Sequence, residues 1–170
     1  MIGGGFALMG GPLARLATFG AKYGLSKNWF IFKESFLPLF IGSLLLLMRR
    51  YKQGSFNKIL LNDALFDNEK IEASLREEVQ DDFKIIVRNA GNHFIFGLFI
   101  SSIIQFFLAS MIVVSDPGES SFNEQVATMT WVSYLAVLVP TILIVGKGYW
   151  ELIAGMEKIT GLKKEDFLKT

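Results

Sequence analysis

Two long runs without a charged residue constrain this chain more than any other feature. Residues 94–114 (FIFGLFISSIIQFFLASMIVV) and residues 126–146 (VATMTWVSYLAVLVPTILIVG) each contain 21 residues and no Asp, Glu, Lys or Arg. As α-helices they would each be about 30 Å long, which is the thickness of the hydrocarbon core of a bilayer. Because lipid offers no partner to backbone N–H and C=O groups, each run is predicted to be a transmembrane helix. The fold class expected is therefore an all-α integral membrane protein.

The segment between the two runs predicts how they are connected. Residues 115–125 (SDPGESSFNEQ) hold an Asp-Pro-Gly turn signal and only acidic charges. Lys84 and Arg88 precede the runs and Lys147 follows them, and basic residues are retained on the cytoplasmic side of a membrane. The pattern predicts an antiparallel transmembrane hairpin with its acidic turn outside and the C-terminus inside. The bacterial inner membrane is the expected location, and an organellar inner membrane is the alternative.

A third apolar segment is shorter, and two interpretations of it stay open. Residues 36–48 are only 13 apolar residues, too short to span, whereas residues 29–48 reach 20 residues but include Lys33 and Glu34. One interpretation is a first membrane helix over residues 29–48, in which the lysine reaches back to the interface. The other is a re-entrant or surface-lying segment that starts near Pro38. The side of the membrane on which the N-terminus lies follows from this choice and is left open.

The remaining segments are polar. Residues 1–28 are rich in glycine, contain basic but no acidic residues, and form the N-terminal segment. Residues 49–93 are predicted to be an amphipathic helical region on the inner side, with a helix that starts at Asp67 or Asn68 and a break at Gly91. Its apolar positions recur every three or four residues on one face, which must pack against the N-terminal segment, the C-terminal helix or another subunit. This inner face consists of Ile71, Leu75, Val79, Phe83 and Ile86.

The second long run is expected to continue as a helix through residues 147–160, because no proline stops it there. Gly161 is the predicted terminator, and residues 161–170 form a polar tail.

Small and polar residues within the runs predict a contact face. Such residues let membrane helices approach closely and hydrogen-bond to one another. Gln105 lies near the middle of its run, with Ser133, Tyr134, Thr141 or a group on another subunit as possible partners. Three roles fit this face: packing within the hairpin, lining a water-filled path, or binding a partner helix. Its residues are Gly97, Ser101, Gln105 and Ala109 at steps of four, and Ser133 and Thr141 on the second run.

The sequence contains no recognisable catalytic chemistry. Cysteine is absent, and His93 is the only histidine; a lone histidine at the end of a membrane helix is expected to be structural rather than a metal ligand. Neither catalytic, cofactor-binding nor metal-binding residues are predicted, and the chain is not expected to be an enzyme. A net charge of +1 gives no reason to expect a nucleic acid partner.

Two functions fit these features. The first is a non-enzymatic integral membrane subunit of a larger machine of the secretion, conjugation or respiratory type, with the lipid bilayer and other membrane subunits as partners in a homo- or hetero-oligomer. The alternative is a channel-forming or ion-path subunit. An outside N-terminus, one span, an inner helical region, an outer hairpin and an inner tail are similar in topology to the ExbB/TolQ proton-channel subunits. Since neither run, residues 94–114 nor residues 126–146, carries an Asp, Glu, Lys, Arg or His, a partner would supply the charge for ion transport.

Overall fold

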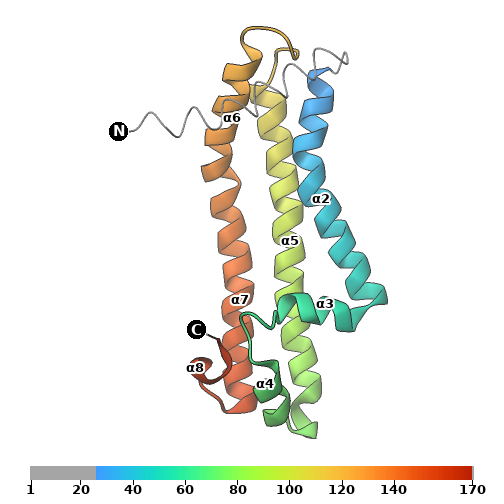
Figure 1. Cartoon of the computed structure of the whole chain (residues 1–170), viewed down its shortest axis with the longest axis vertical. Helices are drawn as coiled ribbons and strands as arrows, with labels where there is room; N and C mark the ends of the chain where they lie inside the picture. Colours follow the sequence, from blue (N-terminus) through green and yellow to red (C-terminus); the bar gives the residue numbers. More distant parts are fainter. Residues whose placement is uncertain (1–25, 170) are drawn as a thin grey trace. The chain divides into compact units, whose positions relative to one another are not determined.

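The structure, a computed structural model, describes residues 26–169, and these residues contain helices and no strand. The predicted N-terminal segment 1–28 lies outside the described residues except for its last three. In chain order the helices, labelled in Figure 1, are α2 (Lys27–Tyr51), α3 (Gln53–Leu60), α4 (Asn68–Ser74), the 3-10 helix η1 (Glu77–Val79), α5 (Gln80–Ile112), α6 (Phe122–Ala136), α7 (Leu138–Thr160) and α8 (Lys164–Phe167).

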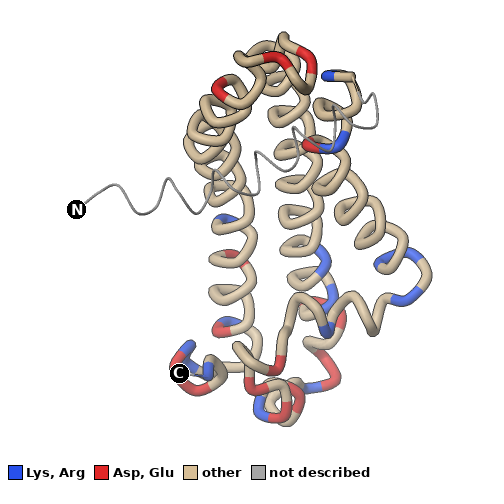
Figure 2. The backbone as a smooth tube through the Cα atoms, turned by 45° about the horizontal axis from the view of Figure 1, so that its top comes forward, with Lys and Arg blue, Asp and Glu red and all other residues tan. Residues whose placement is uncertain are grey.

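Within residues 26–169, three stretches are long and apolar enough to cross a membrane. They are Lys27–Tyr51, Glu77–Ile112 and Phe122–Thr160, whose most apolar 18-residue windows have mean hydropathies of 1.8, 2.1 and 1.9. Figure 2 shows the charge-free lengths of these helices in tan. The chain therefore has the character of a multi-pass helical membrane protein. α2 runs through Pro38 without a break and, at 25 residues, is about 37 Å long, which is sufficient for a full crossing.

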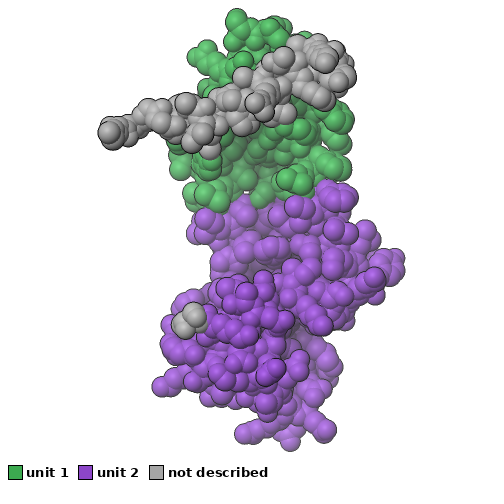
Figure 3. All heavy atoms as spheres, in the orientation of Figure 1, with its two compact units in different colours: residues 1–39, 100–139 green, residues 40–99, 140–170 purple. Residues whose placement is uncertain are grey.

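The chain forms two compact units, coloured separately in Figure 3. Of the described residues, unit 1 comprises 26–39 and 100–139, and unit 2 comprises 40–99 and 140–169. Each unit has its own apolar core. The core of unit 1 consists of Phe30, Ile31, Ala109, Val113, Phe122, Val126 and Met129.

A network of side-chain hydrogen bonds holds the acidic turn of unit 1. The Gln125 side-chain oxygen accepts hydrogen bonds from the backbone N–H groups of Val114 and Ser115, at 2.9 and 3.0 Å. Asp116 accepts from the N–H of Lys27 at 2.8 Å, and the Lys27 ammonium donates to the Val114 carbonyl at 2.8 Å. A carboxylate at the start of α2 satisfies a free helix N–H group and complements the helix dipole. The turn thereby fixes the first residue of α2 within this unit.

Unit 2 contains an apolar cluster built from segments far apart in the sequence. Phe66 and Phe167 are both fully buried in it, together with Ile71, Leu152 and Met156. Backbone hydrogen bonds tie the C-terminal segment to the chain before α4: Asp67 N–H donates to the Phe167 carbonyl at 2.8 Å, and Lys169 N–H donates to the Leu65 carbonyl at 2.9 Å. The segment predicted as a polar tail is therefore part of a core.

The inner region differs from its prediction in two places. α4 ends at Ser74 and the next two residues are extended, with ψ angles of 110° at Leu75 and 152° at Arg76, so the inner face is divided between α4, η1 and α5. Gly91 does not break a helix but lies buried within α5. A methyl group placed on Gly91 would lie 2.6 Å from the Phe56 ring, which shows that the glycine provides room for that ring.

The predicted continuation of the second run through residues 147–160 is confirmed by α7, but the helix over residues 126–160 is interrupted at Val137. α6 ends at Ala136 and α7 begins at Leu138. Pro140 lacks the N–H that would bond to the carbonyl four residues earlier, which is that of Ala136, and its ring crowds the same carbonyl. At the far end α7 stops at Thr160, and Gly161 follows with φ at +72°. This is the left-handed terminator that the sequence predicted.

Candidate functional site

In unit 2, α5 and α7 are in close contact through glycines. A methyl group placed on Gly97 would lie 2.9 Å from Val145 and 3.8 Å from Thr141. Further along, one on Gly148 would lie 2.5 Å from His93 Cβ. Residue numbers rise on one helix as they fall on the other, so the two helices run antiparallel here. The structure thus brings together Gly97 and Thr141, two of the predicted contact residues.

Unit 1 contains the other predicted contact residues, and here α5 packs on both α2 and α6. Ala109 is fully buried in the unit's core with Val126 and Met129 of α6. Ser101 and Ser102 are buried, and the Ser102 hydroxyl donates to the Ser35 carbonyl of α2 at 2.7 Å.

Sequence reasoning missed Ser35. The signal that could have found it is a pair of small residues, Ser35 and Gly42, spaced two helical turns apart on α2. In unit 2, a methyl group placed on Gly42 would lie 3.3 Å from Leu98 Cβ of α5. Small residues therefore bring α2 close to α5 in each unit.

Two polar side chains of unit 1 do not form the bond that the sequence suggested. Gln105 is half-buried. Within the described part of the chain, the Ser133 hydroxyl is buried and has no hydrogen-bond partner, so it is not bonded to Gln105. Tyr134 is largely exposed, at 46%. A buried hydroxyl without a partner is costly in an apolar surrounding.

A groove of about 410 Å³ lies in unit 2, along the facing parts of α2 and α5. At its polar end the Arg49 guanidinium donates a hydrogen bond to the Asn92 side-chain oxygen. Its floor and walls are apolar, with Ile95 buried and Phe96 exposed at 55%. The lining residues are Leu46, Arg49, Asn92, His93, Ile95, Phe96 and Phe99.

His93 is held by a set of hydrogen-bonding and ionic groups. Its Nδ1 lies 3.0 Å from the Asn89 carbonyl, a geometry that assigns a proton to Nδ1. Its Nε2 lies 3.9 Å from the Glu151 carboxylate, which is also 3.8 Å from the Lys147 ammonium. No three His, Asp or Glu side chains are grouped to hold a metal ion anywhere in residues 26–169.

Most of the predicted inner face packs against its own chain. Ile71 is buried, and Leu75, Phe83 and Ile86 pack on the same cluster. Its other members come from the end of α3, the segment before α4, α5, α7 and the C-terminal segment. Val79 lies in η1, is half-buried and is not a member of this cluster. Phe167 is the main residue that sequence reasoning missed here; the only signal was an apolar Phe-Leu pair in a charged tail.

No known protein family, no curated protein and no solved structure matches this chain. Its function is therefore inferred from the helices and contacts themselves.

Proposed function

We propose that the protein is a non-enzymatic integral membrane subunit of a larger multi-protein complex and acts by packing its helices against those of partner subunits. The observation that carries the proposal is the pair of polar side chains in unit 1, Gln105 and Ser133, which lie in apolar runs and are not bonded to each other. Lipid tails offer no hydrogen bond, so polar groups at this depth favour a partner from protein. A second membrane helix with a polar residue would provide one.

The large apolar surface of the three long helices also supports an assembly. Within the most apolar windows, only 28%, 28% and 6% of the residues are buried inside the chain, for the stretches containing α2, α5 and α6–α7 respectively. The remaining surface is available to lipid and to partner helices. The stretch Phe122–Thr160 is the most open, and it also contains Ser133. We therefore place the partner contact on the side formed by α6 and α5 within unit 1.

We further propose that α5 and α6–α7 form a transmembrane hairpin whose acidic turn, residues 115–125, faces outward from the bacterial inner membrane. Basic residues support this orientation, with Arg49 and Arg50 in the last turn of α2 and Lys158 in the last turn of α7. Trp131 and Trp150 are exposed at 60% and 73%. Exposed tryptophans of this kind are typical of the aromatic belts at the two membrane interfaces.

The test uses the absence of cysteine from the chain. A single cysteine or a photoreactive residue at position 105, installed in the full chain and cross-linked in native membranes, should form an adduct with one defined protein. The matched control is position 107, two residues away, where Phe107 is 59% exposed. Gln105→Leu should also reduce the amount of partner that co-purifies in mild detergent, whereas Phe107→Leu should not.

Two results would contradict this proposal. One is a stable monomer in mild detergent with no protein adduct at position 105. The other is Gln105→Leu or Thr141→Val retaining the complex but abolishing ion flux across the membrane, which would favour an ion-path subunit instead. The ion-path alternative is supported by the same Ser133 hydroxyl, because a water molecule or an ion in the path would be a partner for it.

A further inference from the structure

The groove between α2 and α5 in unit 2 has one charged end. Arg49 is half-buried there, in the last turn of α2. One of its N–H groups donates to Asn92, and a guanidinium carries five N–H donors in a planar fork. Among the described residues, the ion pairs do not include Arg49. The Arg49 fork is therefore oriented by Asn92 and retains donors for an anion.

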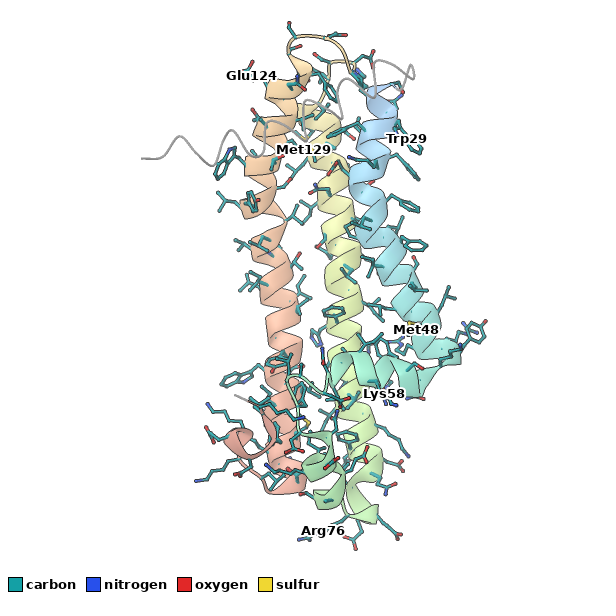
Figure 4. The ribbon with its side chains drawn as sticks, in the orientation of Figure 1. Trp29, Met48, Lys58, Arg76, Glu124 and Met129 are labelled. Carbon is teal, nitrogen blue, oxygen red and sulfur yellow. The ribbon has the colours of Figure 1, made fainter. Side chains whose placement is uncertain are left out.

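The rest of the groove is apolar, and a buried apolar cluster lies behind it. Ile95, in the floor, is 5% exposed and belongs to a cluster with Leu45 and Phe56, which are 6% and 1% exposed. Met48, labelled in Figure 4, packs against the same cluster. Leu46 and Phe96 line the groove yet remain 40% and 55% exposed. The groove is thus an open apolar channel whose floor is part of a buried cluster.

From this combination we propose that the groove binds one anionic phospholipid. The lipid phosphate accepts hydrogen bonds from Arg49, and one acyl chain lies along Leu46, Phe96 and Phe99. An Arg fork matches the oxygens of a phosphate, and basic pockets between membrane helices bind anionic headgroups.

The dimensions of the groove favour a lipid over a partner helix. Its volume of about 410 Å³ is within the range of small-molecule sites. A helix with its side chains is about 10–12 Å across and would need a longer apolar face. The groove lining contains no acidic residue, and Glu151, which lies 3.9 Å from His93 Nε2, is outside the lining and is paired with Lys147. It therefore does not compete for Arg49.

Titration of the delipidated full-length protein in mild detergent tests this proposal by native mass spectrometry. The probes are phosphatidylglycerol and phosphatidylcholine with the same acyl chains. We expect one phosphatidylglycerol to bind per chain. Phosphatidylcholine has the same phosphate, but its choline cation cancels the negative charge of the headgroup, so we expect it to bind about fivefold more weakly.

Two pairs of variants locate the site. Arg49→Gln should weaken phosphatidylglycerol binding about tenfold, whereas Arg50→Gln, with the same loss of charge on the next residue, should change it less than about twofold. Leu46→Trp fills the channel and should abolish binding. Its control, Leu47→Trp, changes a residue that is 53% exposed and outside the groove lining. Helical content by circular dichroism confirms that each variant is folded.

Three results would overturn the proposal: equal binding of the two lipids, equal losses for Arg49→Gln and Arg50→Gln, or full binding by Leu46→Trp. If Arg49→Gln does not fold, the Leu46 and Leu47 pair decides. The measurement needs no partner subunit, and a Gln105→Leu chain should bind phosphatidylglycerol as the wild type does. Failure of lipid binding is thus separable from failure of the proposed assembly.

Discussion

The contact between α5 and α7 in unit 2 makes a specific prediction about two glycines on α7. At Gly148 a methyl group would lie 2.5 Å from His93 Cβ, 3.0 Å from His93 Cγ and 3.4 Å from the Ala90 carbonyl oxygen. At Gly146 it would meet nothing within 4 Å. Replacing each glycine by alanine therefore compares a position that contacts α5 with a position that contacts nothing, on the same helix.

The expected size of the effect follows from these distances. Carbon atoms in favourable contact are about 3.5–4.0 Å apart, so Gly148→Ala must separate the two helices locally by about 1 Å. His93 Cβ is fixed to its backbone and cannot rotate away. Overpacking of this kind costs about 1–3 kcal/mol, which is offset in part by alanine's better helix propensity, about 1 kcal/mol over glycine in water. Gly146→Ala gains the helix propensity of alanine and does not overpack the contact with α5.

Unfolding of the purified protein in mixed micelles, followed by far-ultraviolet circular dichroism during titration with sodium dodecyl sulfate, measures both variants. Gly148→Ala should unfold at a lower detergent fraction than the wild type, and Gly146→Ala at the same or a higher one. The reasoning is refuted if Gly148→Ala is as stable as Gly146→Ala, because α5 and α7 would then not meet at this register.

Two further predictions concern the inner part of unit 2. Phe167→Ala removes a fully buried ring and should destabilise the unit by about 3–5 kcal/mol, seen as faster hydrogen exchange at the backbone amide of Asp67; Trp150→Ala, at a residue 73% exposed, should leave that amide protected. The ammonium group and the backbone N–H of Lys70 both donate hydrogen bonds to the Asp67 carboxylate, and they hold the pKa of Asp67 below its ordinary value of 3.8. The carboxylate therefore stabilises the fold above pH 3.8, and this contribution is lost as the pH falls below 3.8 towards the lowered pKa. Asp67→Asn should therefore reduce the acid sensitivity of unfolding below pH 4, and Glu69→Gln, a change on the same turn, should retain it.

The membrane helices could be predicted because their signal is local. The charge-free runs at residues 94–114 and 126–146 coincide largely with α5 and with α6–α7, since an uncharged length of helix is a property of neighbouring residues alone. The extension of α5 back to Gln80 was not predicted. The Phe56 ring occupies the space beside Gly91 within this helix. In the sequence alone, a glycine that makes room for a distant ring cannot be told from a glycine that ends a helix.

The candidate sites were predictable to a smaller extent for the same reason. The spacing of small residues indicated Gly97 as a contact position because helical periodicity is visible in one segment. The groove at Arg49 and Asn92 was not visible, because its lining residues come from helices more than 40 positions apart in the sequence. The interruption at Val137 was also missed, although Pro140 contained the necessary information: its effect appears at the carbonyl four residues earlier.

The burial of Phe167 has a consequence for the order in which this protein matures. Phe167 completes the cluster around Phe66 and follows the three apolar stretches Lys27–Tyr51, Glu77–Ile112 and Phe122–Thr160 in the sequence. These stretches are therefore translated before that cluster can close, and their insertion into the bilayer does not wait for it. Loss of the Phe167 ring would leave every one of these stretches intact and yet expose an unfinished apolar surface, the form of damage that proteases of membrane quality control recognise.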